Sequence, residues 1–135
     1  MSSLVIPGTL AAFPTPSLSL ARVRFEMTAL DPIRLPPYSG SAWRGLLGRS
    51  LRQAVCVTRQ PRCDGCLLRA QCAYCTIFES PATSPEISRR FSALPHPFVL
   101  EPKLGAPRAV EPGQPLGLGV TLIGTACQVR IDDPI

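Results

Sequence analysis

Five of the six cysteines of the chain lie within twenty residues, and residue types and spacing of this kind bind metals. Counted from the first of these thiols, the spacing is C-x6-C-x2-C-x5-C, given by Cys56, Cys63, Cys66 and Cys72. A fifth thiol follows at Cys75. Asp64 and Gly65 separate the central pair and favour the tight turn that lets two thiolates face one ion or cluster. The pattern predicts a thiolate-held metal centre.

Four interpretations of these thiols compete. A disulfide framework does not suit an odd number of clustered cysteines without a signal peptide before them. A four-thiolate zinc site would use two C-x2-C pairs, Cys63/Cys66 and Cys72/Cys75, but the gap between them is shorter than the usual spacer. A [4Fe-4S] cluster would be held by the first four thiols, and buried thiols that bind nothing are the simplest case. We favour iron-sulfur over zinc, and both stay open.

The cysteine spacing, with Pro61-Arg62 before the second cysteine and Ala73-Tyr74 after the fourth, resembles the iron-sulfur loop of the endonuclease III glycosylases. About twenty residues carry this resemblance, and the sequence has no helix-hairpin-helix signature. The resemblance therefore implies a cluster held by Cys56, Cys63, Cys66 and Cys72, without glycosylase activity.

The positive charge of the chain is concentrated around the cysteines. The net charge is +5, and Lys103 is the single lysine among 14 basic residues. Seven arginines and one acid lie between Arg34 and Arg69. High arginine usage across the gene would explain the number but not the clustering, and guanidinium groups bind phosphate oxygens in bidentate fashion. We predict that RNA is bound by Arg44, Arg49, Arg52, Arg59, Arg62 and Arg69.

Several elements must position these groups. Alternating apolar residues predict a half-buried strand from Ser19 to Ala29, and further strands are predicted at Phe98–Glu101 and Leu116–Gly124. Residues 80–88 and 102–115 are interpreted as proline-broken loops. A helix is predicted from about Ser41 to Val55, with a core side formed by Trp43, Leu46, Leu47, Leu51, Ala54 and Val55.

The opposite stripe of this helix contains Gly45 and Gly48 between arginines. Two interior glycines cost about 1 kcal/mol each relative to alanine, so we expect a close approach by another backbone. A nucleic-acid strand and a neighbouring strand of the protein are the two candidates.

The 135 residues correspond to one α+β domain, with an irregular lead-in at 1–18, the domain at 19–131 and the cysteine loop at 56–75 within it. No apolar run approaches the roughly twenty residues of a membrane span. The uncharged first twenty residues do not match a secretory signal. We therefore expect a reducing, cytoplasmic location without membrane contact.

Four segments together carry a wider resemblance: L-P-P-Y-S-G-S-A-W-R-G-L-L-G, C-A-Y-C-T-I-F-E, P-H-P-F-V-L-E-P and G-V-T-L-I-G-T-A. In order and spacing, they resemble one branch of the CRISPR-associated endoribonucleases of the RAMP superfamily, the sixth Cas protein family. The resemblance runs from about Leu35 to Ala126. It implies a ferredoxin-like fold related to the RNA-recognition motif, binding of CRISPR repeat RNA, and metal-independent cleavage by the ribose 2'-hydroxyl.

Members of that family are longer, with a second ferredoxin-like domain. We therefore expect this chain to be an incomplete N-terminal part, partnered by a C-terminal half or by other CRISPR effector subunits. His96, the only histidine, lies between two prolines and is interpreted as a structural or surface residue, which leaves the catalytic residues unassigned. Tyr38 is interpreted as a core residue, with a contributed hydroxyl or an exposed ring that stacks an RNA base as the alternatives. The alternatives are a non-catalytic nucleic-acid-binding adaptor with a structural zinc or iron-sulfur site, and a redox carrier.

Overall fold

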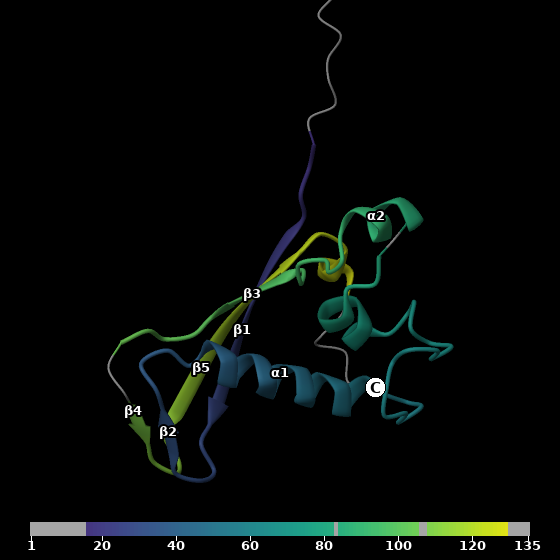
Figure 1. Cartoon of the computed structure of the whole chain (residues 1–135). Helices are drawn as coiled ribbons and strands as arrows, with labels where there is room; N and C mark the ends of the chain where they lie inside the picture. The colour runs from purple at the N-terminus through teal and green to yellow at the C-terminus, as the bar shows by residue number, and fades with distance from the viewer. Residues whose placement is uncertain (1–15, 83, 106–107, 130–135) are drawn as a thin grey trace, which may run out of the picture.

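The computed structural model describes residues 16–82, 84–105 and 108–129. Its main sheet has three antiparallel strands in the order β1-β5-β3. Strand β1 (Leu20–Thr28) pairs along its whole length with β5 (Pro115–Ile123). Strand β3 (Phe98–Glu101) pairs with the other edge of β5. Helix α1 (Gly40–Val55) lies across one face of this sheet (Figure 1).

Strands β1 and β5 confirm the predicted alternation, and β3 lies where a short strand was predicted. In β5 the leucines and Val120 are buried against the helix side, while Gly117, Gly119 and Thr121 share the opposite face. Strand β1 alternates exposed and half-buried residues, as expected of an edge strand with one apolar face. The glycine face of β5 is covered by long side chains, because Arg24 lies over Gly117 and Glu101 lies over Gly119.

Helix α1 has the predicted position but a narrower buried side. Trp43 is buried, and Leu47 and Leu51 pack against the core, so these three confirm the helical spacing. Leu46 is 47% exposed and Ala54 is also exposed, so their placement in the core was wrong. Gly48, assigned to the opposite stripe, is buried against the ring of Phe78, so the buried side of the helix is turned away from Leu46.

Several short elements were not predicted from the sequence, and two of them, β4 (Arg108–Val110) and α2 (Pro85–Arg90), overlap the predicted loops. Strands β2 (Ile33–Leu35) and β4 form a separate two-stranded antiparallel sheet. Helix α2 lies within the proline-broken region. The π-helix η1 (Cys75–Glu79) and the 3-10 helix η2 (Gly124–Gln128) complete the elements. The loop predictions for 80–88 and 102–115 were therefore wrong in part.

The molecule is a mixed α and β structure with antiparallel sheets, which confirms the α+β class. Its core joins the inner face of β5 to Trp43, Ile77, Val110 and Ala126. None of the helices in the described part of the chain is long and apolar enough to cross a membrane. The predicted lead-in at 1–18 falls almost entirely outside the described residues.

Candidate metal centre and nucleic-acid interface

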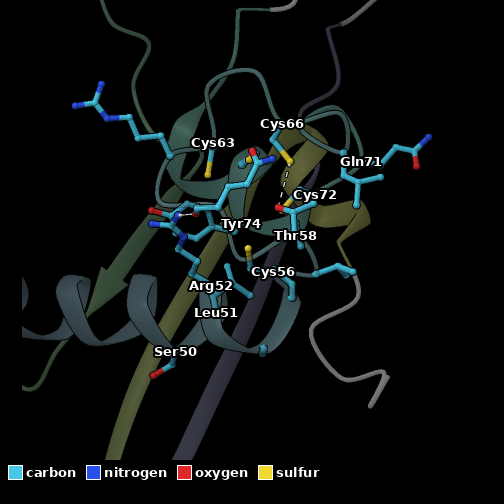
Figure 2. A pocket seen from close by; sticks show the side chains of 18 of the residues that line it. Ser50, Leu51, Arg52, Cys56, Thr58, Cys63, Cys66, Gln71, Cys72 and Tyr74 are labelled. Carbon is cyan, nitrogen blue, oxygen red and sulfur yellow. Dashed lines mark hydrogen bonds between the residues drawn. The ribbon is translucent and has the colours of Figure 1, made fainter.

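The end of α1 and the loop after it enclose a cavity of about 960 Å³. All five clustered cysteines line it. Figure 2 shows the Cys56 side chain at the end of the helix and the Cys63, Cys66 and Cys72 side chains on the loop around the same space. The fifth, Cys75, is the buried thiol at the start of η1. The structure therefore brings together the whole set that the sequence indicated.

Local backbone geometry explains this convergence. Helix α1 ends at Cys56, whose N–H donates to the carbonyl of Arg52 at 2.9 Å while its own backbone is extended. The chain then turns back at Cys63, where the Cys66 N–H donates to the Cys63 carbonyl at 3.1 Å. Gly65 has φ +76°, which strains any L-residue with a side chain. The predicted tight turn between Cys63 and Cys66 is thus present.

The thiols differ in their electrostatic surroundings. Burial, followed by the neighbouring Cys63 and Cys72 thiols, raises the pKa of the Cys75 thiol to about 12. The backbone amide of Arg59 acts in the opposite direction on Cys56 and holds the pKa of that thiol below its ordinary value. Arg59 has φ +52°, so the loop holds a non-glycine residue in a left-handed conformation at this point.

The donor set suits a thiolate-bound metal group. All six cysteines are free, and four soft thiolates on one cavity are the ligands that iron-sulfur clusters and structural zinc use. Within the described residues, no three or more His, Cys, Asp or Glu side chains have the arrangement needed to hold a metal ion. The residue types thus match those that hold such a group, but in this structure their side chains are not placed to hold one ion.

Two of the predicted RNA-binding arginines hold the cysteine loop. The Arg52 guanidinium donates to the carbonyls of Gln60 at 2.6 Å and Pro61 at 3.0 Å, and lies 5.6 Å from the centroid of the Tyr74 ring. Arg69 pairs with Asp64 at 3.2 Å. Both guanidinium groups therefore already form hydrogen bonds to residues of the cysteine loop.

The other four predicted arginines are exposed. None of them pairs with a carboxylate in the part of the chain that the structure describes. Arg62 lines the cysteine cavity, and Arg44 lies at the other end of α1, where it contacts His96. Arg44 and Arg62 therefore lie near opposite ends of α1.

The two glycines of α1 have different surroundings. A Cβ at Gly48 would lie 3.0 Å from a ring carbon of Phe78, while nothing lies within 4 Å of a Cβ at Gly45. Close approach at Gly48 is therefore made by a side chain of the protein itself. Neither of the two expected backbone neighbours, a nucleic-acid strand or a strand of the protein, accounts for this glycine.

Sequence reasoning missed an aromatic cluster that runs along this side of α1. Tyr74 and Phe78 stack at 5.5 Å, Phe78 and Phe98 are 4.9 Å apart, and His96 stacks on Phe98 at 5.8 Å between ring centroids. The i, i+4 spacing of Tyr74 and Phe78 was the only local signal, and it suggested neither the π-helical turn nor the partners on β3. Tyr38 is 68% exposed, so its assignment to the core was wrong.

Comparison with known proteins gives one family. A family model described as AF_1859_N, N-terminal domain, matches residues 18–130, which is most of the chain. Neither the curated proteins nor the solved structures contain a match to the chain. The chain belongs to the AF_1859_N family of N-terminal domains.

Proposed function

We propose that this chain is a CRISPR-associated RNA-binding protein that takes part in processing precursor CRISPR RNA. The order of its elements carries the proposal. Strand β1, helix α1, strand β3 and strand β5 occur in this order, with shorter elements between them, and β5 pairs between β1 and β3. This is the arrangement expected for the first half of a ferredoxin-like, RNA-recognition-motif-related domain. Three of the four sequence segments that resemble the RAMP endoribonucleases lie mainly on α1, β3 and β5, and the fourth, C-A-Y-C-T-I-F-E, lies on η1.

The cysteine cavity is proposed to hold a [4Fe-4S] cluster, with Cys56, Cys63, Cys66 and Cys72 as ligands, or a zinc ion. The group would supply folding energy and fix the loop to the end of α1. Arg59 and Arg62, which are exposed on that loop, would then be held in place toward RNA phosphates. Because the protein has six free thiols, we expect it to be located in a reducing cytoplasm.

Binding is tested with CRISPR repeat RNA from the source genome and with a shuffled RNA of the same length. We expect preferential binding of the repeat RNA, weakened by raised salt because phosphate contacts dominate the affinity. Equal and salt-insensitive binding of both RNAs, or no binding, would overturn the proposed function.

Cleavage separates this proposal from a non-catalytic adaptor, which remains the second candidate. His96 is hydrogen-bonded at both ring nitrogens, by Arg44 and Ser80, and these contacts favour a positioning role. Repeat-RNA cleavage that survives His96→Ala would support an endoribonuclease with its base elsewhere. An intact wild-type protein that binds without cleaving would favour the adaptor, with catalysis supplied by a C-terminal half or another effector subunit.

A further inference from the structure

A second cavity, of about 750 Å³, lies between the start of α1 and strand β3. Tyr38, Ser41 and Arg44 line it from the helix side, and His96 and Phe98 line it from the strand side. It shares no lining residue with the cysteine cavity. The groups around it are a guanidinium, two hydroxyls, an imidazole and aromatic rings.

His96 fixes the position of Arg44. A guanidinium only donates hydrogen bonds, so Nε2 of His96 must accept the 2.7 Å bond from Arg44. The imidazole proton then lies on Nδ1 and is donated to the hydroxyl of Ser80 at 3.3 Å. One amino group of Arg44 is occupied in this way, and its other donors are available to a ligand.

The charge balance of the cavity favours an anion. Among the described residues, no carboxylate pairs with Arg44. Glu101 also lines the cavity, but its carboxylate accepts hydrogen bonds from Arg22 and from the hydroxyl of Thr121 at 2.9 Å. Arg22 compensates the charge of that carboxylate, so the charge of Arg44 is left without a partner.

An exposed aromatic ring lines the same cavity as this guanidinium. Tyr38 packs its hydroxyl end against Gly40, where a Cβ would come within 2.7 Å of the hydroxyl oxygen. Glycine at the first position of α1 thus lets the ring lie over the start of the helix. Single-stranded RNA is recognised by such pairs, because bases stack on aromatic rings while arginine binds the adjacent phosphate.

We propose that this cavity binds one phosphodiester group of single-stranded RNA through Arg44, with His96 as the positioning residue and Tyr38 stacking the neighbouring base. The inference rests on the proposed RNA-binding function and adds to it the place and the residues of one contact.

The test is binding of a labelled single-stranded oligoadenylate over a range of salt concentrations, to wild type, Arg44→Ala and Arg90→Ala. Arg90 is an exposed arginine of α2 that lines neither cavity, so its loss changes the net charge equally. We expect Arg44→Ala to bind roughly tenfold more weakly. Its slope of log affinity against log salt should fall by about 0.7, the value for one phosphate of a single strand. Arg90→Ala should retain the wild-type affinity and slope.

Two further variants distinguish the roles and guard against misfolding. Tyr38→Ala should weaken binding about tenfold without changing the salt slope, because stacking releases no counterions. His96→Ala should weaken binding in the wild-type background but have no effect in Arg44→Ala, because its contribution passes through Arg44. Circular dichroism and thermal melting establish that each variant is folded.

The outcomes separate the two claims. If wild type binds the RNA and Arg44→Ala behaves like Arg90→Ala, the phosphate site is refuted while the proposed function stands. If wild type binds neither oligoadenylate nor repeat RNA, both are refuted together.

Discussion

The guanidinium of Arg52 lies over the ring of Tyr74, with its central carbon 5.6 Å from the ring centroid. The same guanidinium donates to two consecutive loop carbonyls, those of Gln60 and Pro61. The Arg52 side chain thus contacts two parts of the cysteine loop. These are the carbonyls of residues 60 and 61, which precede Cys63, and the ring of Tyr74, which precedes Cys75. Arg52 connects the helix to the cysteine cavity independently of any bound group.

Replacing Arg52 should therefore destabilise the protein. We expect Arg52→Ala to lower the free energy of unfolding by about 2 kcal/mol, because hydrogen bonds from a charged donor and a cation-π contact are lost together. Arg52→Lys should recover only part of this, since an ammonium cannot reproduce the planar fork. Urea denaturation measures the effect, with the exposed Arg49→Ala as the matched control. Equal stability of Arg52→Ala and Arg49→Ala would contradict the account.

The two glycines of α1 give a matched pair of substitutions on one helix. Gly45→Ala should raise the free energy of unfolding by about 0.5–1 kcal/mol, because space is open there and alanine favours the helix. Gly48→Ala places a methyl 3.0 Å from the Phe78 ring, which is held by its aromatic neighbours. The steric cost of this contact should then outweigh the gain in helix propensity and lower the free energy of unfolding by about 1 kcal/mol. Similar effects at both positions would show that Phe78 moves freely.

Glu101 should make stability depend on acid pH. Its hydrogen bond with Arg22, followed by that with Thr121, holds the pKa of the carboxyl below its ordinary value. A pKa that is lower in the folded state contributes stability above the unfolded value of about 4.3. This contribution is lost as the pH falls through the folded pKa.

The measurement is thermal melting of wild type and Glu101→Gln at a series of pH values from neutral downward. Wild type should be the more stable at neutral pH, and the difference should shrink below about pH 4.3 as the carboxylate is protonated. Comparing the two proteins at each pH removes the effect of other acid-sensitive groups. A difference that stays constant into the acid range would rule out this contribution.

Local patterns were enough to predict the main strands and α1. Alternation of apolar residues identified β1 and β5, and the position of the helix followed from its spacing. Helix α2 was missed although Ser84 and Pro85 are a common start, and the Ser84 hydroxyl does accept from the Ile87 N–H at 3.3 Å. Its six residues were too few to show periodicity.

The parts of the site that could not be predicted depend on distant residues. Local spacing was enough to indicate that Cys56 to Cys75 would line one cavity, because the turn at Gly65 lies within the stretch itself. The pairing of Arg44 with His96 joins residues 52 positions apart and depends on how β3 is placed beside α1. The charge pattern likewise could not distinguish arginines that hold the loop, such as Arg52, from those left exposed.

The cysteine-held centre is the central claim, and metal analysis with an absorption spectrum of protein purified without oxygen tests it most directly. Cys127 donates to the carbonyls of Ser19 and Leu122 and does not line the cavity, so Cys127→Ala is the control for Cys63→Ala. The account predicts about four irons per chain with a broad iron-thiolate band, lost in Cys63→Ala and kept in Cys127→Ala. A result of one zinc per chain would support a thiolate site that holds zinc instead of an iron-sulfur cluster. A metal-free wild type, with Cys63→Ala as stable as Cys127→Ala, would contradict the claim.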